Sequence, residues 1–153
     1  MSFSGTVLVT GASAGIGEAC ARAFAAAGAR LVLTARRRER LEALAEELGG
    51  AHGAECRLLT LDVRDAAAVQ AALGGLPPEW AAIDLLVNNA GLGRGLEPLF
   101  RGEPADWDEM VDTNVKGLLY VTRAVTPGMV ERGRGHVINL GSVAGHEVYP
   151  GGA

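Results

Sequence analysis

Three glycines lie where a short apolar run gives way to a helical pattern. They are Gly11, Gly15 and Gly17, in the segment Thr-Gly-Ala-Ser-Ala-Gly-Ile-Gly at 10–17. Glycines in such a turn let the backbone approach a pyrophosphate, and the N-terminus of the following helix presents free N–H groups to the anion. The spacing G-x-x-x-G-x-G differs from the common G-x-G-x-x-G fingerprint. Alone, these glycines could form an ordinary turn, but in the first strand-to-helix connection they indicate a dinucleotide site.

A run of three arginines, 36–38, follows the second apolar run. NAD-binding proteins usually place an acidic residue near the end of this strand to bind the ribose 2′-hydroxyl. Here Thr34 and Ala35 stand at that place. Arginine suits a 2′-phosphate because its planar donors can clamp the anion, whereas a solvated helix start, the alternative, would oppose the helix dipole. We therefore predict an NADP(H) site, with Arg36 as the first candidate for the 2′-phosphate and Arg37 as the second.

Polar residues also follow the third and fourth apolar runs. Asp62 and Val63 end the third run, and Asn-Asn-Ala-Gly at 88–91 ends the fourth. Ligands of open parallel sheets bind beyond the carboxyl ends of the strands. We therefore expect these residues near the adenine and ribose, although Asn-Asn-Ala-Gly alone could be an ordinary turn.

Two further polar residues are ambiguous on the sequence alone. Asn114 falls on the apolar side of a long predicted helix, four residues after Met110 and three after Val111. A buried amide costs stability unless its hydrogen bonds are met, so Asn114 is either a satisfied core amide, which the periodicity favours, or a functional one. Ser142 has the position of a loop serine after the fifth apolar run. The histidines at 52, 136 and 146 share no metal-ligand spacing, so we expect no metal site.

Short apolar runs alternate with helical patterns along the chain, and this alternation would position the candidate residues. We expect strands at 6–9, 30–34, 57–63, 83–87 and 136–140. Strand, helix and strand in repetition imply a parallel sheet with right-handed crossovers and helices on both faces, which is a doubly wound α/β fold. No repeat or linker interrupts the pattern, so we expect a single dinucleotide-binding domain over 1–153.

The apolar stripe of each predicted helix indicates which side is buried. Asp65 is the expected N-cap of a helix that runs through Leu73. The stripes are Ile16, Cys20, Ala23, Phe24 and Ala27 in the first helix; Leu41, Leu44, Ala45 and Leu48 in the second, which would end at Gly49-Gly50; and Trp107, Met110, Val111, Val115, Leu118 and Val125 in the long helix 104–129.

The composition excludes several classes of function. A formal net charge of -4 gives no general attraction to nucleic acid or to an anionic membrane. The content of 48% hydrophobic and 21% charged residues is ordinary for a soluble globular protein. We see no signal peptide and no apolar run that could span a bilayer, and the two cysteines form no CxxC pair. We therefore expect a cytoplasmic protein.

Five motifs in this order resemble the short-chain dehydrogenase/reductase family, and the resemblance covers the whole chain. They are Thr-Gly-x-x-x-Gly-Ile-Gly at 10–17, Asp62-Val63, Asn-Asn-Ala-Gly at 88–91, Asn114 in Asp-Thr-Asn-Val-Lys-Gly, and Ser142 in Gly-Ser-Val-Ala-Gly. The segments at 33–37, 106–114, 145–146 and 149–152 are similar to the NADP-dependent 3-hydroxy acid (serine/allo-threonine-type) branch.

This resemblance implies a Rossmann-type sheet with strand order 3-2-1-4-5 and a homo-oligomer, dimeric or tetrameric. It implies hydride transfer between NADP(H) and a small hydroxy or carbonyl substrate, with a 3-hydroxy acid as the first candidate. It assigns Ser142 and Asn114 to the catalytic site, where the serine would position the substrate oxygen and the asparagine would support a proton relay. The implied cofactor contacts are Gly11, Ser13, Gly15, Ile16, Gly17, Arg36, Arg37, Asp62, Val63, Asn89, Ala90 and Gly91.

The family's Tyr-x-x-x-Lys motif does not occur in these 153 residues, because Ala153 stands four places after Tyr149. In the family this tyrosine transfers the proton and the lysine lowers its pKa, so we expect the family's C-terminal part, with this motif, to be lacking here and turnover to be negligible. Two alternatives stay open. One is a truncated dinucleotide-binding module without catalysis, and the other is a 3-oxoacyl carrier-protein reductase or another carbonyl reductase of the same family.

Overall fold

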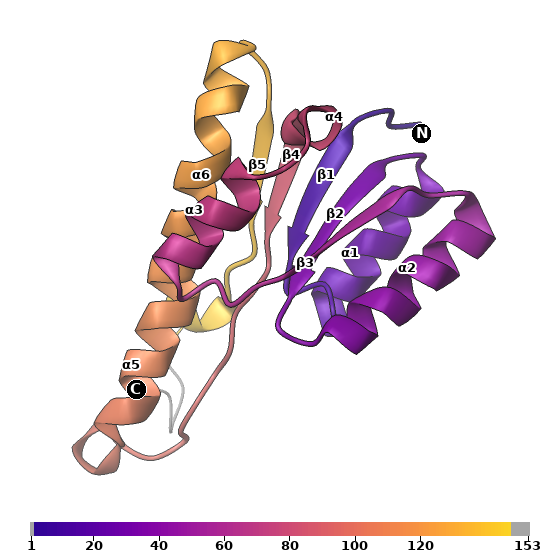
Figure 1. The fold of residues 1–153 in the computed structure, drawn as a ribbon. Coiled ribbons are helices and arrows are strands. Elements are labelled where there is room, and N and C mark those ends of the chain that lie inside the picture. Colours follow the sequence, from indigo (N-terminus) through magenta and orange to yellow (C-terminus); the bar gives the residue numbers. More distant parts are fainter. Residues whose placement is uncertain (1, 148–153) are drawn as a thin grey trace.

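The computed structural model describes residues 2–147 and contains one parallel sheet of five strands (Figure 1). The order across the sheet is β3-β2-β1-β4-β5, which confirms the predicted doubly wound topology. The strands are β1 Thr6–Thr10, β2 Arg30–Ala35, β3 Cys56–Thr60, β4 Ile83–Asn88 and β5 His136–Asn139. The helices are α1 Gly15–Ala26, α2 Arg38–His52, α3 Ala66–Gly74, α4 Pro78–Ala81, α5 Pro104–Met110 and α6 Leu118–Glu131, with short helical turns at Leu99–Arg101 and Val143–Gly145.

Helices cover both faces of the sheet, α1 and α2 on one side and α3 and α6 on the other (Figure 1). Successive residues of a strand point to opposite faces, so a central strand must be apolar on both. In β1, Val7 and Val9 pack toward α1 and α2, whereas Leu8 packs toward α3 and α6. All three are fully buried. The continuous apolar runs of the sequence therefore form a sheet with a core on each side.

The buried side of α1 differs from the predicted stripe. Gly17, Ala21 and Ala25 are buried, whereas Ala23 is exposed and Ile16 has 64% of its surface exposed. Small residues face the sheet because α1 packs closely against it, and a Cβ added to Gly17 would lie 2.6 Å from the Gly11 carbonyl oxygen. The prediction was wrong for Ile16 and Ala23, whereas Cys20 and Phe24 are partly buried and pack against the core on this side of the sheet.

The bounds of other elements also differ from the prediction, by one residue at the ends of β1, β2, β4 and β5 and by more in α2 and β3. The helix α2 buries Leu41, Leu44 and Leu48, but it continues through the two glycines at 49–50 and ends at His52. Gly53 then takes the left-handed conformation, with φ 64°, that commonly ends a helix. The strand β3 ends at Thr60 and not at residue 63, and β5 ends at Asn139. The predicted cap of α3 is confirmed, because the Ala68 N–H donates to the Asp65 carboxylate at 2.9 Å.

The long helix predicted for 104–129 consists of α5, a π-helical segment at Val111–Gly117, and α6. The prediction that Val111 and Val115 are buried is wrong, because 48% and 52% of their surfaces are exposed. The wider π-helical turn changes which side of the helix is buried, and the buried positions in this segment carry the small residues Thr113 and Gly117. The buried residues along the segment and α6 are Thr113, Gly117, Val121, Val125 and Met129. Within the part of the chain that the structure describes, no helix is long and apolar enough to cross a membrane.

Candidate functional site

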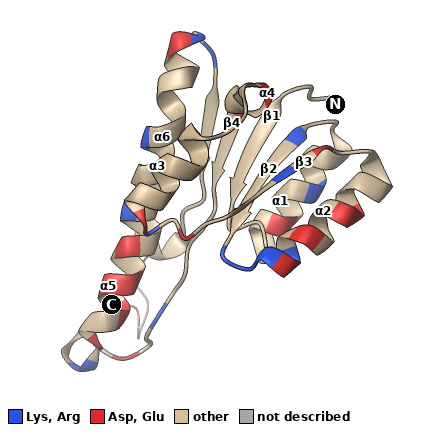
Figure 2. Ribbon diagram, viewed as in Figure 1, with Lys and Arg blue, Asp and Glu red and all other residues tan. Residues whose placement is uncertain are grey.

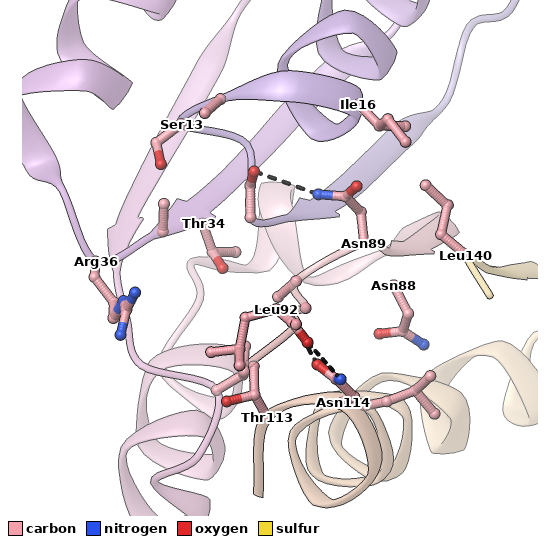
Figure 3. Close-up of a pocket in the computed structure, with 18 of the residues that line it drawn as sticks. Ser13, Ile16, Thr34, Arg36, Asn88, Asn89, Leu92, Thr113, Asn114 and Leu140 are labelled. Carbon is pink, nitrogen blue, oxygen red and sulfur yellow. Dashed lines mark hydrogen bonds between the residues drawn. The ribbon is translucent and has the colours of Figure 1, made fainter. Parts of the chain in front are cut away.

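A cleft with a volume of about 950 Å³ lies at the carboxyl ends of the strands, where loops from all five strands meet the long helix (Figure 3). Sites for small ligands usually have volumes of ~300–1,000 Å³. The structure brings twelve of the predicted site residues into its wall, while Gly15 and Gly17 are not among the described residues that form it. The twelve are Gly11, Ser13, Ile16, Arg36, Arg37, Asp62, Val63, Asn89, Ala90, Gly91, Asn114 and Ser142.

The glycine loop between β1 and α1 forms one side of the cleft. Gly11 and Gly15 have positive φ values, 66° and 58°, which residues other than glycine rarely adopt. Gly17 lies against Asn89, where an added Cβ would approach the amide nitrogen to 2.3 Å. The α1 helix therefore begins close to the end of β4. Its first-turn N–H groups have no partners within the helix, and Ala14 at the N-cap has no polar side chain to accept from them.

Thr10 joins the end of β1 to the loop after β4. Its hydroxyl oxygen accepts hydrogen bonds from the backbone N–H groups of Asn89 and Ala90, both at 2.9 Å, and it donates to the Val87 carbonyl at 3.3 Å. The Asn89 side-chain amide donates back to the Thr10 carbonyl at 2.9 Å. These bonds fix the Asn-Asn-Ala-Gly segment against the glycine loop. Thr10 was not predicted as a site residue, although its position just before Gly11 was the available signal.

Asn88 fixes the other side of the same strand end. Its amide nitrogen donates to the Thr122 hydroxyl at 2.8 Å and to the Asn139 side-chain oxygen at 2.9 Å. One buried side chain thus joins β4 to α6 and to the end of β5. Sequence reasoning did not identify this role, because its partners lie 34 and 51 residues further along the chain.

The three consecutive arginines after β2 have different surroundings. Figure 2 shows this basic segment in blue between β2 and α2. Arg37 donates to the Ser13 hydroxyl at 3.0 Å, and Arg38 pairs with Glu42 at 2.7 Å, one turn along α2. Arg36 lines the cleft and makes no side-chain hydrogen bond or ion pair with any residue in the range 2–147 (Figure 3).

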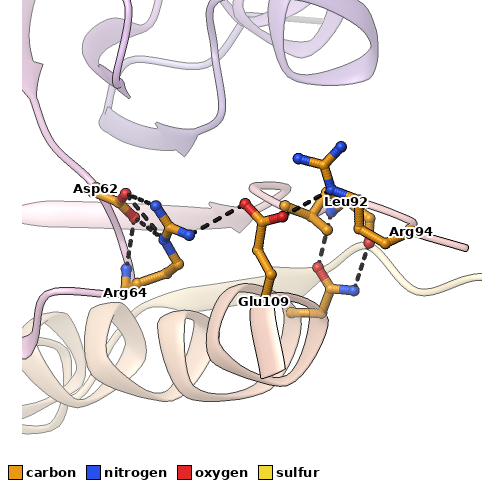
Figure 4. Close-up of polar contacts among 6 residues, drawn as sticks. Asp62, Arg64, Leu92, Arg94 and Glu109 are labelled. Atoms are coloured by element: carbon orange, nitrogen blue, oxygen red, sulfur yellow. Dashed lines mark hydrogen bonds and ion pairs between the residues drawn. The ribbon is translucent and has the colours of Figure 1, made fainter. Parts of the chain in front are cut away.

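Asp62 lines the cleft in the loop after β3 and is held by Arg64 (Figure 4). The Arg64 side chain donates to both carboxylate oxygens, with the shortest contact, from Nη2, at 2.7 Å, and the Arg64 backbone N–H donates at 3.0 Å. The guanidinium of Arg64 lowers the pKa of Asp62 below its ordinary value, and the positive charge of Arg36 adds to this effect. Asp62 is therefore ionised at neutral pH.

Asn114 lies in the middle of the π-helical segment and is exposed, so it is not a core amide. Its side-chain oxygen accepts from the Leu92 N–H at 2.9 Å, and its nitrogen donates to the Leu92 carbonyl at 2.8 Å (Figures 3 and 4). Single π-helical turns often occur at functional sites. The segment here directs a polar side chain toward the loop after β4.

Ser142 follows β5 at the opposite end of the cleft from Arg36. Its hydroxyl oxygen accepts from the Ala144 N–H at 3.2 Å and caps the short turn at Val143–Gly145. Tyr149 lies outside the residues that the structure describes. Among the described residues there is no cluster of His, Cys, Asp or Glu that could hold a metal ion.

The sheet order, the glycine loop and the cleft beyond the strand ends together define a Rossmann-type α/β protein. A profile of the short chain dehydrogenase family matches residues 5–153, and the chain belongs to this family.

Individual relatives agree with this assignment. The chain is 55% identical over 148 residues to the NADP-dependent 3-hydroxy acid dehydrogenase YdfG of Salmonella typhi, covering 95% of this chain and 57% of that protein. It is 50% identical over 150 residues to sulfoacetaldehyde reductase 2 of Chromohalobacter salexigens, covering 97% and 59%. It is also similar to the closed form of a serine dehydrogenase complexed with NADP+, with a TM-score of 0.89, 52% identity and coverage of 96% and 58%. The chain thus spans rather more than half the length of these relatives.

Proposed function

We propose that the cleft binds NADP(H). The single observation that supports this most strongly is Arg36, which lines the cleft just after β2, where NAD-binding proteins usually have an acid. A 2′-phosphate there would accept charge-assisted hydrogen bonds from the Arg36 guanidinium, which none of the described residues accepts. Arg37 would assist Arg36, and it would also position the Ser13 hydroxyl, to which it donates a hydrogen bond.

The donors along the cleft suit the rest of a dinucleotide. The first turn of α1, together with the loop residues Gly11 to Gly17, offers N–H groups and a positive dipole end to the pyrophosphate. Asp62 and Val63 would contact the adenine, and the segment 89–91 would contact the ribose. Ile16, whose side chain is exposed in the wall of the cleft, would cover the bound cofactor.

The activity we propose is that of an oxidoreductase acting on a small hydroxy or carbonyl compound, with a 3-hydroxy acid as the first candidate. Bound NADP(H) would supply or accept the hydride. The Ser142 hydroxyl would orient the substrate oxygen, and Asn114 would hold the loop after β4 and support a proton relay. Two relatives at 50–55% identity are named for a 3-hydroxy acid and for sulfoacetaldehyde, both small substrates with an anionic group, which supports this class.

The 153-residue polypeptide allows cofactor binding to be measured apart from turnover. It contains no Tyr-x-x-x-Lys motif, and a general acid–base group contributes ~10²–10⁴ in rate. We expect NADPH to bind, as measured by the rise in nicotinamide fluorescence, while serine and other 3-hydroxy acids are not oxidised at a measurable rate. Binding of NADPH would support the proposed cofactor, and a failure of NADPH to bind would refute the proposal.

The substrate class is tested with a version of the protein that carries a Tyr-x-x-x-Lys segment. A panel of serine, other 3-hydroxy acids and 3-oxoacyl thioesters separates the proposed class from a 3-oxoacyl carrier-protein reductase, and activity on thioesters alone would overturn the 3-hydroxy acid assignment. We also propose a cytoplasmic homo-oligomer, dimeric or tetrameric. The exposed apolar residues Val111, Val115 and Leu119 on the long helix support association, which light scattering would measure.

A further inference from the structure

The Glu109 carboxylate joins two loops that border the cleft (Figure 4). One oxygen accepts from Arg64 Nη1 at 3.2 Å, and the other accepts from Arg94 Nε at 2.8 Å. Arg64 belongs to the loop after β3, and Arg94 belongs to the loop after β4. Glu109 itself lies in the last turn of α5, so one helix residue bridges two separate segments of the cleft mouth.

Each of these two arginines is also linked to residues that line the cleft. Arg64 holds the Asp62 carboxylate through its side chain and its backbone N–H. Arg94 follows Leu92 and Gly93, which are part of the cleft wall. A change in the position of Glu109 would therefore alter both sides of the cleft mouth.

The same stretch of helix fixes the loop after β4 at three points. The Asn114 side chain bonds the Leu92 backbone in both directions, and the Arg94 backbone N–H donates to the Met110 sulfur at 3.3 Å. The Glu109–Arg94 ion pair is the third attachment. The loop after β3 is joined to this helix by the Glu109–Arg64 pair.

The charge of Glu109 by itself would oppose the ligand that we propose. Its side chain is 22% exposed, and Arg94 beside it holds its pKa below the ordinary value, so it is negative at neutral pH. A dinucleotide phosphate is also negative, and Glu109 lies close enough to Arg36 for their charges to interact. Electrostatics and positioning therefore predict opposite effects when this charge is removed.

We infer that Glu109 is a positioning residue that holds the two loops of the cleft mouth at the separation that NADP(H) binding requires. This inference rests on the proposed function for its ligand, but its structural part concerns this chain alone. The carboxylate acts through the two arginines and is not among the described residues that line the cleft.

The first test compares Glu109→Gln with Asp112→Asn, by NADPH titration. Asp112 is a matched control, because it follows Glu109 in the same continuous helical stretch, lies within electrostatic reach of Arg64, and among residues 2–147 pairs only with Lys116 one turn away. Both variants remove one negative charge. We expect Glu109→Gln to raise the NADPH dissociation constant about two- to fivefold, the scale of partly exposed ion pairs, and Asp112→Asn to leave it unchanged or lower it. An unchanged or lower constant for Glu109→Gln would overturn the inference.

The second test needs no ligand and measures amide hydrogen exchange in the free protein. The N–H groups of Arg64 and Arg94 are reporters, because they donate to Asp62 and to Met110. Glu109→Gln should accelerate exchange at both positions, and Asp112→Asn at neither. Acceleration at one position only, or at neither, would refute the coupling of the two loops. If the parent protein did not bind NADPH, the proposed function would fail, and the exchange result would still decide the inference.

The two arginines provide a check on the bridge itself. They lie on different loops, and Glu109 accepts a hydrogen bond from each of them. Arg64→Gln should therefore accelerate exchange at the Arg94 N–H, and Arg94→Gln at the Arg64 N–H, but neither should have a further effect in a Glu109→Gln background. Additive effects in that background would show that the loops communicate by another route and would overturn the inference.

Discussion

Asn114 and Leu92 form a pair of opposed hydrogen bonds, in which the side-chain amide both accepts from the Leu92 N–H at 2.9 Å and donates to its carbonyl at 2.8 Å. Such a pair satisfies both backbone groups of a residue that belongs to no helix or strand. At Leu92 the loop after β4 is therefore held by one side chain as it would be by a neighbouring strand.

Asn114→Ala should release this loop. Two partly solvated hydrogen bonds are lost, so we expect the free energy of unfolding to fall by about 0.5–1.5 kcal/mol, measured by urea denaturation. Asn114→Asp keeps the acceptor but places a carboxylate against the Leu92 carbonyl, so it should not restore the loss. Unchanged stability together with unchanged hydrogen exchange at Leu92 would show that the pair is not formed in solution.

Arg36→Ala should change the preference between the two cofactors. Charge-assisted hydrogen bonds contribute about 1.5–3 kcal/mol, so we expect the dissociation constant of NADPH to rise about tenfold or more and that of NADH to change little. Arg38→Ala is the control, because Arg38 pairs with Glu42 on α2 and does not line the cleft. Equal losses for NADPH and NADH in Arg36→Ala would contradict a 2′-phosphate contact.

Gly17→Ala should weaken both folding and cofactor binding. The new methyl group would lie 2.3 Å from the Asn89 amide nitrogen and 2.6 Å from the Gly11 carbonyl oxygen, which forces α1 away from the loop. Overpacking of this kind costs about 1–3 kcal/mol. Gly50→Ala, inside α2 with nothing within 4 Å of the added Cβ, should instead stabilise the protein by up to about 1 kcal/mol. Equal effects of the two substitutions in thermal unfolding would argue against the packing at Gly17.

Acidification should remove the contribution of Asp62 to stability. Arg64 lowers the pKa of Asp62 in the folded state, so the ionised carboxylate stabilises the fold at pH values above the ordinary pKa of about 3.9. That contribution is lost as the pH falls through the lowered value. Asp62→Asn should therefore be less stable than the parent at pH 7, and the difference should shrink below about pH 4. A difference in melting temperature that stays constant between pH 7 and pH 3 would contradict this account.

The strands and most of the cleft were predictable because each depends on short stretches of sequence, whereas the strand order followed from the resemblance to the family. Val7, Leu8 and Val9 are apolar in succession, which is sufficient for a strand buried on both faces. Since the carboxyl ends of parallel strands meet at one edge, residues after each strand could be assigned to one site without knowledge of the packing. Gly11 and Asn89 were placed in this way.

The helix faces and the bridging residues were harder to predict. Hydrophobicity marks Ile16 and Val115 as core residues, but the close approach of α1 and the π-helical turn leave both exposed. Glu109 has an unremarkable sequence context, because its partners Arg64 and Arg94 lie 45 and 15 residues away. Ion pairs between distant segments leave no periodic signal in the sequence.

The place of β1 at the centre of the sheet has a consequence for the order in which the protein is made. β1 pairs with β2 on one side and with β4 on the other, although it is the first strand of the chain. During synthesis β2 can pair with it early, and β3 with β2. The second edge of β1 stays unpaired until Ile83–Asn88 leave the ribosome, a wait on the order of seconds at typical elongation rates. A nascent chain of this topology thus exposes an apolar strand edge before its partner exists, which makes that interval the one in which it is most open to aggregation and to chaperone binding.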